Sequence, residues 1–155
     1  MIDIVRFDDK GYGKKLGFKK VYFKELKIED GERKNFENKK VDIITGLEKE
    51  KRADHMKYRS SGLNHILCKI AKENKISIGF SFNDVLKSKG MLRGQILGRM
   101  MQNVKICRKY KTKMIVFSFA ENKKEMRDVK DLISFGRVIG MTPGEAKKSV
   151  EFKKK

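Results

Sequence analysis

A buried strand, a charged loop and an amphipathic helix follow one another between Met114 and Met141, and this order constrains the fold more than any other stretch. The apolar run at 115–119 (IVFSF) is typical of a parallel strand that is covered on both faces. The loop at 121–130 is rich in both charge signs, and apolar residues then recur at helical spacing up to Ile139. The stretch therefore predicts one strand-loop-helix unit of an α/β fold, in which the loop carries the function.

Similar units precede and follow it. We expect strands at Met1–Phe7, Val21–Leu26, Val41–Thr45, Ile76–Phe82 and 115–119. We expect helices at Glu29–Lys40, at 63–70 with Ser60 or Ser61 as the N-cap, at Gly90–Tyr110, at 129–139 and from Thr142, where Pro143 and Glu145 suit the first turn. The segment Leu47–Ser61 has no hydrophobic period and is expected to be a long surface loop. Strands that alternate with helices predict parallel pairing with right-handed crossovers, within one domain over residues 1–155 that ends in a basic tail at 153–155.

The charge balance points to a polyanionic partner or a membrane surface. The chain has 39 Lys and Arg against 20 Asp and Glu, a net charge of +19, and most of the excess lies in residues 76–155. No run of 18 apolar residues and no signal-peptide layout is present, so we expect a soluble intracellular protein. Cys68 and Cys107 are expected to be buried free thiols rather than a disulfide.

The sequence offers little for independent catalysis. It has two histidines, and His65 with Cys68 forms one possible ligand pair without a second pair. Gly11-Tyr12-Gly13 is only a fragment of a phosphate-binding glycine loop. We therefore expect no catalytic residue, no bound metal and no cofactor held by the chain itself.

Basic residues instead stand at expected helix starts and strand-helix loops. Four of them are Arg59, Arg93, Arg127 and Lys147. An arginine fork matches a phosphate, and a helix N-terminus adds partly positive N–H groups, so together they could bind an RNA backbone. The alternative is that they are ordinary solvated helix ends.

Several segments between Val41 and Val150 carry a family resemblance. They read VDIIT, GLNHILCKIA, ISIGFSFNDVL, SFAENKKEMRDVKDLISFGRVIGM and EAKKSV. In order and spacing they resemble the ribonuclease P protein component 3 family, the archaeal relatives of the thirty-kilodalton subunit of eukaryotic ribonuclease P. The resemblance implies a TIM-like barrel, related to metal-dependent hydrolase barrels, that binds RNA and has no active site of its own.

The same resemblance implies a role in removing the 5′ leader from precursor tRNA, an endonucleolytic cleavage carried out by the RNA subunit with magnesium. The implied partners are ribonuclease P RNA, precursor tRNA through the holoenzyme, and ribonuclease P protein component 2, in a two-plus-two assembly. The implied location is the archaeal cytoplasm. We keep two alternatives: a general basic RNA-binding or ribosome-associated α/β protein, and an independent hydrolase of the barrel superfamily.

The resemblance also implies residue roles. The family's RNA-contacting basic positions fall on Arg93, Lys109, Arg127 and Lys147, and Arg59 matches another within one position. Tyr58 stands where a basic residue is usual. His65 takes the place of the family's helix-start histidine, which would order the preceding loop or contact RNA.

Length is the main departure from the family. A full barrel has eight strands and usually roughly 200 or more residues, whereas about five strands are expected here. About two strand-helix units of the N-terminal half are missing from this sequence. We therefore expect a shortened or partly open barrel whose edges need to be covered.

Overall fold

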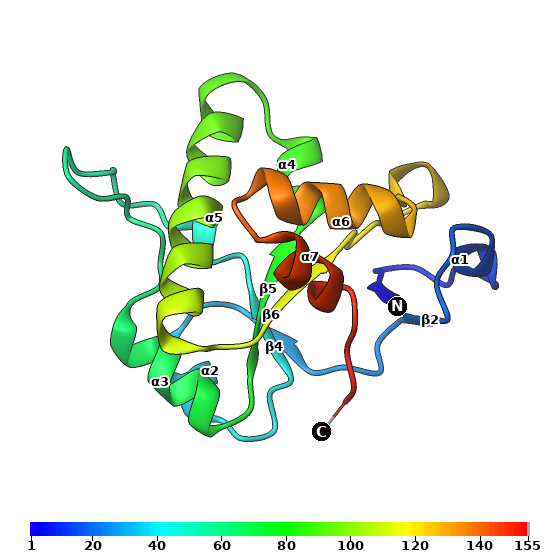
Figure 1. Ribbon diagram of the computed structural model, residues 1–155, viewed down its shortest axis with the longest axis horizontal. Coiled ribbons are helices and arrows are strands. Elements are labelled where there is room, and N and C mark those ends of the chain that lie inside the picture. The colour runs from blue at the N-terminus through cyan, green and yellow to red at the C-terminus, as the bar shows by residue number, and fades with distance from the viewer. Residues whose placement is uncertain (155) are drawn as a thin grey trace.

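The computed structural model describes residues 1–154, which form an α/β fold with six parallel strands (Figure 1). The strands are β1 (Ile2–Ile4), β2 (Lys20–Tyr22), β3 (Ile28–Glu29), β4 (Ile43–Thr45), β5 (Ser77–Ser81) and β6 (Met114–Phe117). The helices are α1 (Tyr12–Lys15), α2 (Arg33–Glu37), α3 (His65–Glu73), α4 (Phe82–Lys87), α5 (Gly90–Tyr110), α6 (Val129–Val138) and α7 (Pro143–Ser149). Two 3-10 turns are η1 (Leu47–Lys49) and η2 (Lys123–Glu125). None of the helices in this part of the chain is long and apolar enough to cross a membrane.

The six strands lie side by side in a curved, barrel-like arrangement that is open at one place. We call this arrangement the wall. β1 pairs with β2, and β3, β4, β5 and β6 pair in that order, all in parallel. Hydrogen bonds connect the two groups where β1 and β6 end: Phe119 N donates to Ile4 O at 2.9 Å, and Arg6 N donates to Ala120 O at 2.8 Å. The order around the wall is therefore β2, β1, β6, β5, β4, β3. Within residues 1–154 the wall does not close between β2 and β3, which gives the partly open, TIM-like barrel that was expected.

Alternate residues of the strands fill two separate cores, because successive side chains point to opposite faces. Ile44, Ile78 and Val116 belong to the outer core, which packs against the helices. Ile43, Ile115 and Phe117 belong to the inner core, inside the wall. The inner space is narrow near β5: a Cβ atom on Gly79 would lie 2.6 Å from Cε1 of Phe117. A glycine is therefore needed where the phenylalanine ring fills the interior.

The segment 23–27 crosses the gap between β2 and β3. Leu26 is buried in the inner core, and Lys27 O accepts hydrogen bonds from the backbone of Asp42 and Ile43. From the carboxyl-terminal part of the chain, Phe152 enters the same inner core beside Tyr22, with ring centroids 6.1 Å apart. These two segments fill part of the interior beside the opening between β2 and β3.

Most helices were predicted correctly. α5 begins and ends where its apolar pattern predicted, and Thr142 and Glu145 form the predicted capping box of α7. Cys68 and Cys107 are buried free thiols, as predicted.

Three predictions of local structure were wrong. The wall has six strands rather than five, because the two-residue β3 lies where the expected helix at Glu29–Lys40 was to begin, and only Arg33–Glu37 of that range is helical. The second strand ends at Tyr22, since Lys24 adopts a left-handed conformation (φ 61°). Helix α3 is capped by Asn64, whose side chain accepts from Leu67 N at 2.9 Å, and not by Ser60 or Ser61.

Candidate nucleic-acid interface

Arg93 and Arg127 lie on either side of α4. Arg93, in the first turn of α5, donates through Nε to the carbonyl oxygens of Val85 and Ser88, at 3.1 and 2.7 Å. It thereby satisfies carbonyl groups at the end of α4, which otherwise lack partners. Arg127 donates to two carbonyl oxygens of its own loop, and its guanidinium carbon lies 5.2 Å from the ring centroid of Phe82. The structure thus brings these two predicted residues to one short helix, and Arg127 is only partly buried.

Arg59 lies on the surface of α5. Its backbone is held from both sides by Gln102, which accepts from Arg59 N at 2.9 Å and donates to Arg59 O at 2.7 Å. Its guanidinium group rests against Gly98, where a Cβ atom would come within 2.5 Å of Cζ. Half of the Arg59 side chain stays exposed beside its ion-pair partner Asp54. No sequence pattern singled out Gln102, because a glutamine that binds backbone has no characteristic spacing.

Arg99 differs from the other basic residues of α5. The spacing of the apolar residues in α5 places Arg99 off their face, as it does Arg93, Lys105 and Arg108, yet Arg99 is only 2% exposed. Its guanidinium group donates to the carbonyl oxygens of Glu48, Glu50 and Arg52 and to the Asp54 carboxylate, at 2.6–3.0 Å. These bonds fix the base of the loop that carries Arg59. Burial alone would raise the pKa of Asp54, but hydrogen bonds from Ser60 N and Arg99 lower it overall.

The remaining predicted residues gather at the opposite end of α5. The rings of His65, the first residue of α3, and Tyr110 lie 6.1 Å apart, and Lys109 Nζ lies 5.7 Å from the Tyr110 ring. His65 and Lys109 are exposed. Lys147 is exposed on α7, two residues beyond Glu145.

An ion pair connects α7 to this end of α5. Arg108 binds both carboxylate oxygens of Glu145, at 2.8 and 2.6 Å, and this guanidinium group lowers the Glu145 pKa to about 2. The predicted basic residues therefore form two groups along α5, and Arg93 is about 24 Å from Lys109 at 1.5 Å per residue. Such a spread suits an extended backbone better than a small ligand. The RNA-binding roles themselves stay predictions.

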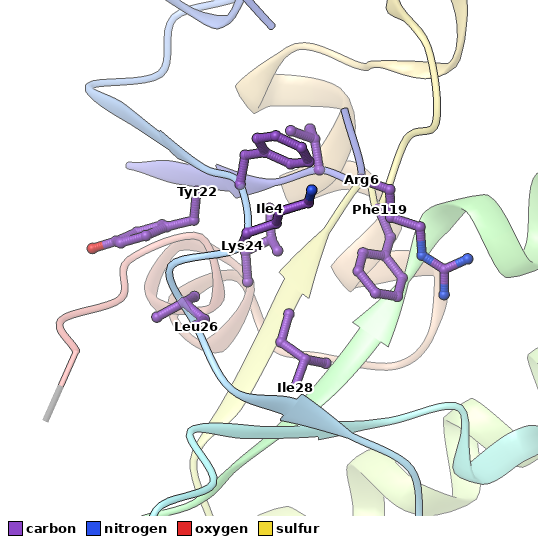
Figure 2. A pocket seen from close by; sticks show the side chains of 9 residues that line it. Ile4, Arg6, Tyr22, Lys24, Leu26, Ile28 and Phe119 are labelled. Carbon is purple, nitrogen blue, oxygen red and sulfur yellow. The ribbon is translucent and has the colours of Figure 1, made fainter. Parts of the chain in front are cut away.

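Two neighbouring hollows lie beside the open side of the wall, and Arg6, Ile28 and Phe119 line both. One, of about 260 Å³, is bordered by Ile4, Tyr22, Leu26, Ile28 and Phe119, with Arg6 and Lys24 at its rim (Figure 2). The other, of about 400 Å³, lies at the carboxyl ends of the strands and contains Lys49 paired with Asp84 at 2.7 Å. Over residues 1–154, no three His, Cys, Asp or Glu side chains come together in a group that could hold a metal ion.

Comparison with known proteins gives one consistent result. A family model described as "RNase P subunit p30" matches residues 28–154. The chain is 32% identical to ribonuclease P protein component 3 of Methanosarcina mazei over 111 residues, and 35% identical to that of Thermococcus kodakarensis over 94 residues. These alignments cover 71% and 61% of this chain and 43% of each relative, so the chain spans less than half the length of these relatives.

A solved structure shows the same fold. It is a cryo-EM structure of archaeal ribonuclease P with mature tRNA, and one of its chains superposes with a TM-score of 0.69 at 20% identity. The superposition covers 96% of this chain and 76% of that chain. The family match covers all five basic residues and His65 of the predicted interface. Because the match extends over most of the sequence and the fold agrees, this chain belongs to the RNase P subunit p30 family.

Proposed function

We propose that this chain is an RNA-binding protein subunit of ribonuclease P, which assists a catalytic RNA in removing the 5′ leader from precursor tRNA. The observation that supports it most is the family match over residues 28–154, since this region contains both groups of basic residues along α5. In this proposal the RNA supplies the chemistry together with magnesium, and the protein positions and neutralises the RNA backbone. The archaeal relatives make the cytoplasm the proposed location.

The arrangement of side chains supports a binding role in two ways. Arg93 and Arg127 are held by carbonyl oxygens of the protein, so their forks are ordered before any RNA arrives. Ordered donors lose less conformational freedom on binding than flexible ones do. Lys109 and Lys147 are exposed and add charge at the other end of α5.

Ribonuclease P protein component 2 is the proposed protein partner, in a two-plus-two assembly. The opening of the wall supports a partner of some kind, because β2 and β3 each have only one neighbouring strand in the described region. Such edges are normally covered in stable proteins.

The decisive experiment is precursor-tRNA cleavage by the cognate ribonuclease P RNA at modest magnesium concentration, with and without component 2 and this chain. We expect strong stimulation only when both proteins are present. No stimulation, with RNA binding intact, would favour a general RNA-binding protein. Cleavage by the chain alone, free of RNA and abolished by a chelator, would favour a hydrolase.

A pair of variants adds a residue-level control. Arg127→Gln removes a predicted contact, whereas Lys130→Gln removes an exposed charge from the first turn of α6. We expect the first variant to reduce the stimulation about tenfold and the second to leave it nearly unchanged. Equal effects would show that only total charge matters.

A further inference from the structure

Ten lysines border two neighbouring pockets at the amino ends of the strands, far from the predicted contacts near α4. We call this surface the basal lysine face. The pocket of about 490 Å³ is lined by Lys24, Lys27, Lys39, Lys40 and Lys154, together with Glu25, Leu26 and Asp42. The pocket of about 350 Å³ is lined by Lys72, Lys75, Lys111, Lys113 and Lys153. The lysines come from the segments that precede β3, β4, β5 and β6 and from the chain after α7, so the face is continuous across the strand starts.

The lysines of the second pocket lack carboxylate partners. Over residues 1–154, no Asp or Glu forms an ion pair with any of these five lysines, and no Asp or Glu lines the pocket. The carboxyl ends of the strands differ: there Lys49 pairs with Asp84, and Arg6 and Lys87 pair with Glu121. Uncompensated like charges in one pocket repel one another, so this arrangement does not stabilise the fold.

The backbone shows a second unusual feature at the same place. Four helices end in the same pair of backbone hydrogen bonds, the Schellman motif, with one residue in a left-handed conformation. That residue is Gly17 after α1 and Gly140 after α6, and glycine is usual at this position. After α3 it is Lys75 and after α5 it is Lys111, both with φ 55°. Left-handed backbone disfavours a residue with a Cβ atom, so these two lysines stand where a glycine would fit better. Both lie in the second pocket.

Lys113 and Phe152 form the floor of this pocket. Lys113 Nζ lies 4.8 Å from the Phe152 ring, and burial lowers the pKa of Lys113. A bound anion would favour its charged form.

We propose that the basal lysine face binds the phosphodiester backbone of RNA, as a contact surface across the amino ends of the strands that begins beside the basic residues at the carboxyl end of α5. This inference rests on the proposed function only in taking RNA as the partner. Within the described residues, the lysines of the second pocket have no ion-pair partner, and the lysines of both pockets follow a line of strand starts, which suits a repeating polyanion. A lipid surface fits less well, because the apolar residues of the two pockets, Leu26, Ile76 and Phe152, are buried and cannot insert into it.

Lysine-to-glycine variants test this inference sharply, because they remove a charge while relieving the backbone. We would measure binding of a fluorescent RNA duplex of about 16 base pairs by anisotropy across a range of salt concentrations. Lys75→Gly and Lys111→Gly should each weaken binding several-fold and reduce the slope of log K against log salt by about 0.9. Their melting temperatures should stay equal to that of the wild type or rise.

Lys10 provides a matched control. It is an exposed lysine in the same left-handed region (φ 47°), but it follows β1 at the opposite end of the strands. Lys10→Gly should leave the slope nearly unchanged, and Lys75→Arg and Lys111→Arg should retain wild-type binding.

Three results would overturn the inference. The first is a wild-type salt slope in both Lys75→Gly and Lys111→Gly, and the second is an equal loss of RNA affinity in Lys10→Gly. The third is that Lys75→Gly and Lys111→Gly lose binding to phosphatidylserine vesicles but keep wild-type RNA binding. The outcome is separate from the cleavage assay. A chain that fails to stimulate cleavage, but shows the predicted slopes, would contradict the proposed function and leave the basal RNA surface standing.

Discussion

Glu48 is a fully buried carboxylate in η1, held by the amide of Asn103, whose Nδ2 donates to Oε1 at 3.2 Å. Burial raises its pKa from 4.5 to about 7. The folded protein therefore keeps a proton that the unfolded chain releases between these two pH values. The stability that this proton contributes is complete below pH 4.5 and is lost as the pH rises to 7. Asp3, buried beside Ser118, acts in the same direction up to about pH 6.

Glu48→Gln should remove the part of this pH dependence that comes from Glu48 and leave the part that comes from Asp3. The amide of glutamine stays neutral, so the variant avoids the free-energy cost of a buried carboxylate. It should therefore be more stable than the wild type at pH 8, by up to about 3 kcal/mol, and similar to it at pH 4.5. Urea unfolding at several pH values checks this, with the exposed Glu50→Gln as the control. A wild-type slope between pH 6 and 7 in the Glu48 variant would contradict the assignment.

Arg99→Met should destabilise the fold by about 3 kcal/mol, because it leaves three carbonyl oxygens and the Asp54 carboxylate without their buried donor. Urea unfolding measures this loss. Lys105→Met, an exposed position of the same helix, should change stability by less than about 0.5 kcal/mol. Equal effects of the two variants would show that Arg99 does not hold the loop.

The sequence could not reveal the role of Arg99. Helical periodicity identifies a buried face by its apolar residues, but α5 also buries Arg99 and Asn103 against a loop that has few apolar residues. Their partners are largely backbone carbonyl groups. Every residue type has one, so the sequence does not show which residues will accept these hydrogen bonds. Arg93 and Arg127 were easier to place, because each stands at the start of a recognisable helix.

Helices and strands differ in how far the sequence predicted them. Helix α5 was predicted closely, as running from Gly90 to about Tyr110, since 21 residues provide nearly six turns of pattern. Strands of two or three residues, such as β3 and β2, contain at most one alternation, so their ends cannot be recognised from periodicity. The capping box of α7 was recognisable because its residue types have fixed spacing.

Leu26→Ala tests whether the segment 23–27 helps to fill the open wall. Leu26 is buried in the inner core and lines the hollow in Figure 2. Its loss should cost about 2 kcal/mol, near the lower end for leucine truncations, because the site is already beside open space. Thermal unfolding measures this, and the exposed neighbour Glu25→Ala should have little effect. An unchanged melting temperature for Leu26→Ala would mean that the segment does not contribute to the core.

The open barrel as a whole was predictable in outline, because the family resemblance implied a TIM-like barrel and the short sequence implied fewer strands than a full barrel has. The sequence did not predict which segments complete most of the wall and fill its interior beside the opening. Hydrogen bonds between segments far apart in sequence, such as Ser118 N to Asp3 Oδ1 at 2.7 Å, connect β6 to β1 and complete most of the wall. Leu26 and Phe152 enter the interior from segments that are neither strand nor helix in the structure, although the sequence had predicted a strand as far as Leu26.

The net charge of +19 leads to a prediction about RNA binding by the complete chain. Basic residues lie along α5 and across the basal lysine face, so contact with 6–10 phosphates is within reach. Each neutralised phosphate releases counterions, and affinity should therefore fall roughly 10³–10⁵-fold between 50 and 200 mM salt. Fluorescence anisotropy measures this directly. Circular dichroism at both salt concentrations serves as the control, since screening reduces self-repulsion and the fold should persist. A flat response would show that charge does not drive binding, and that the basic residues have another role.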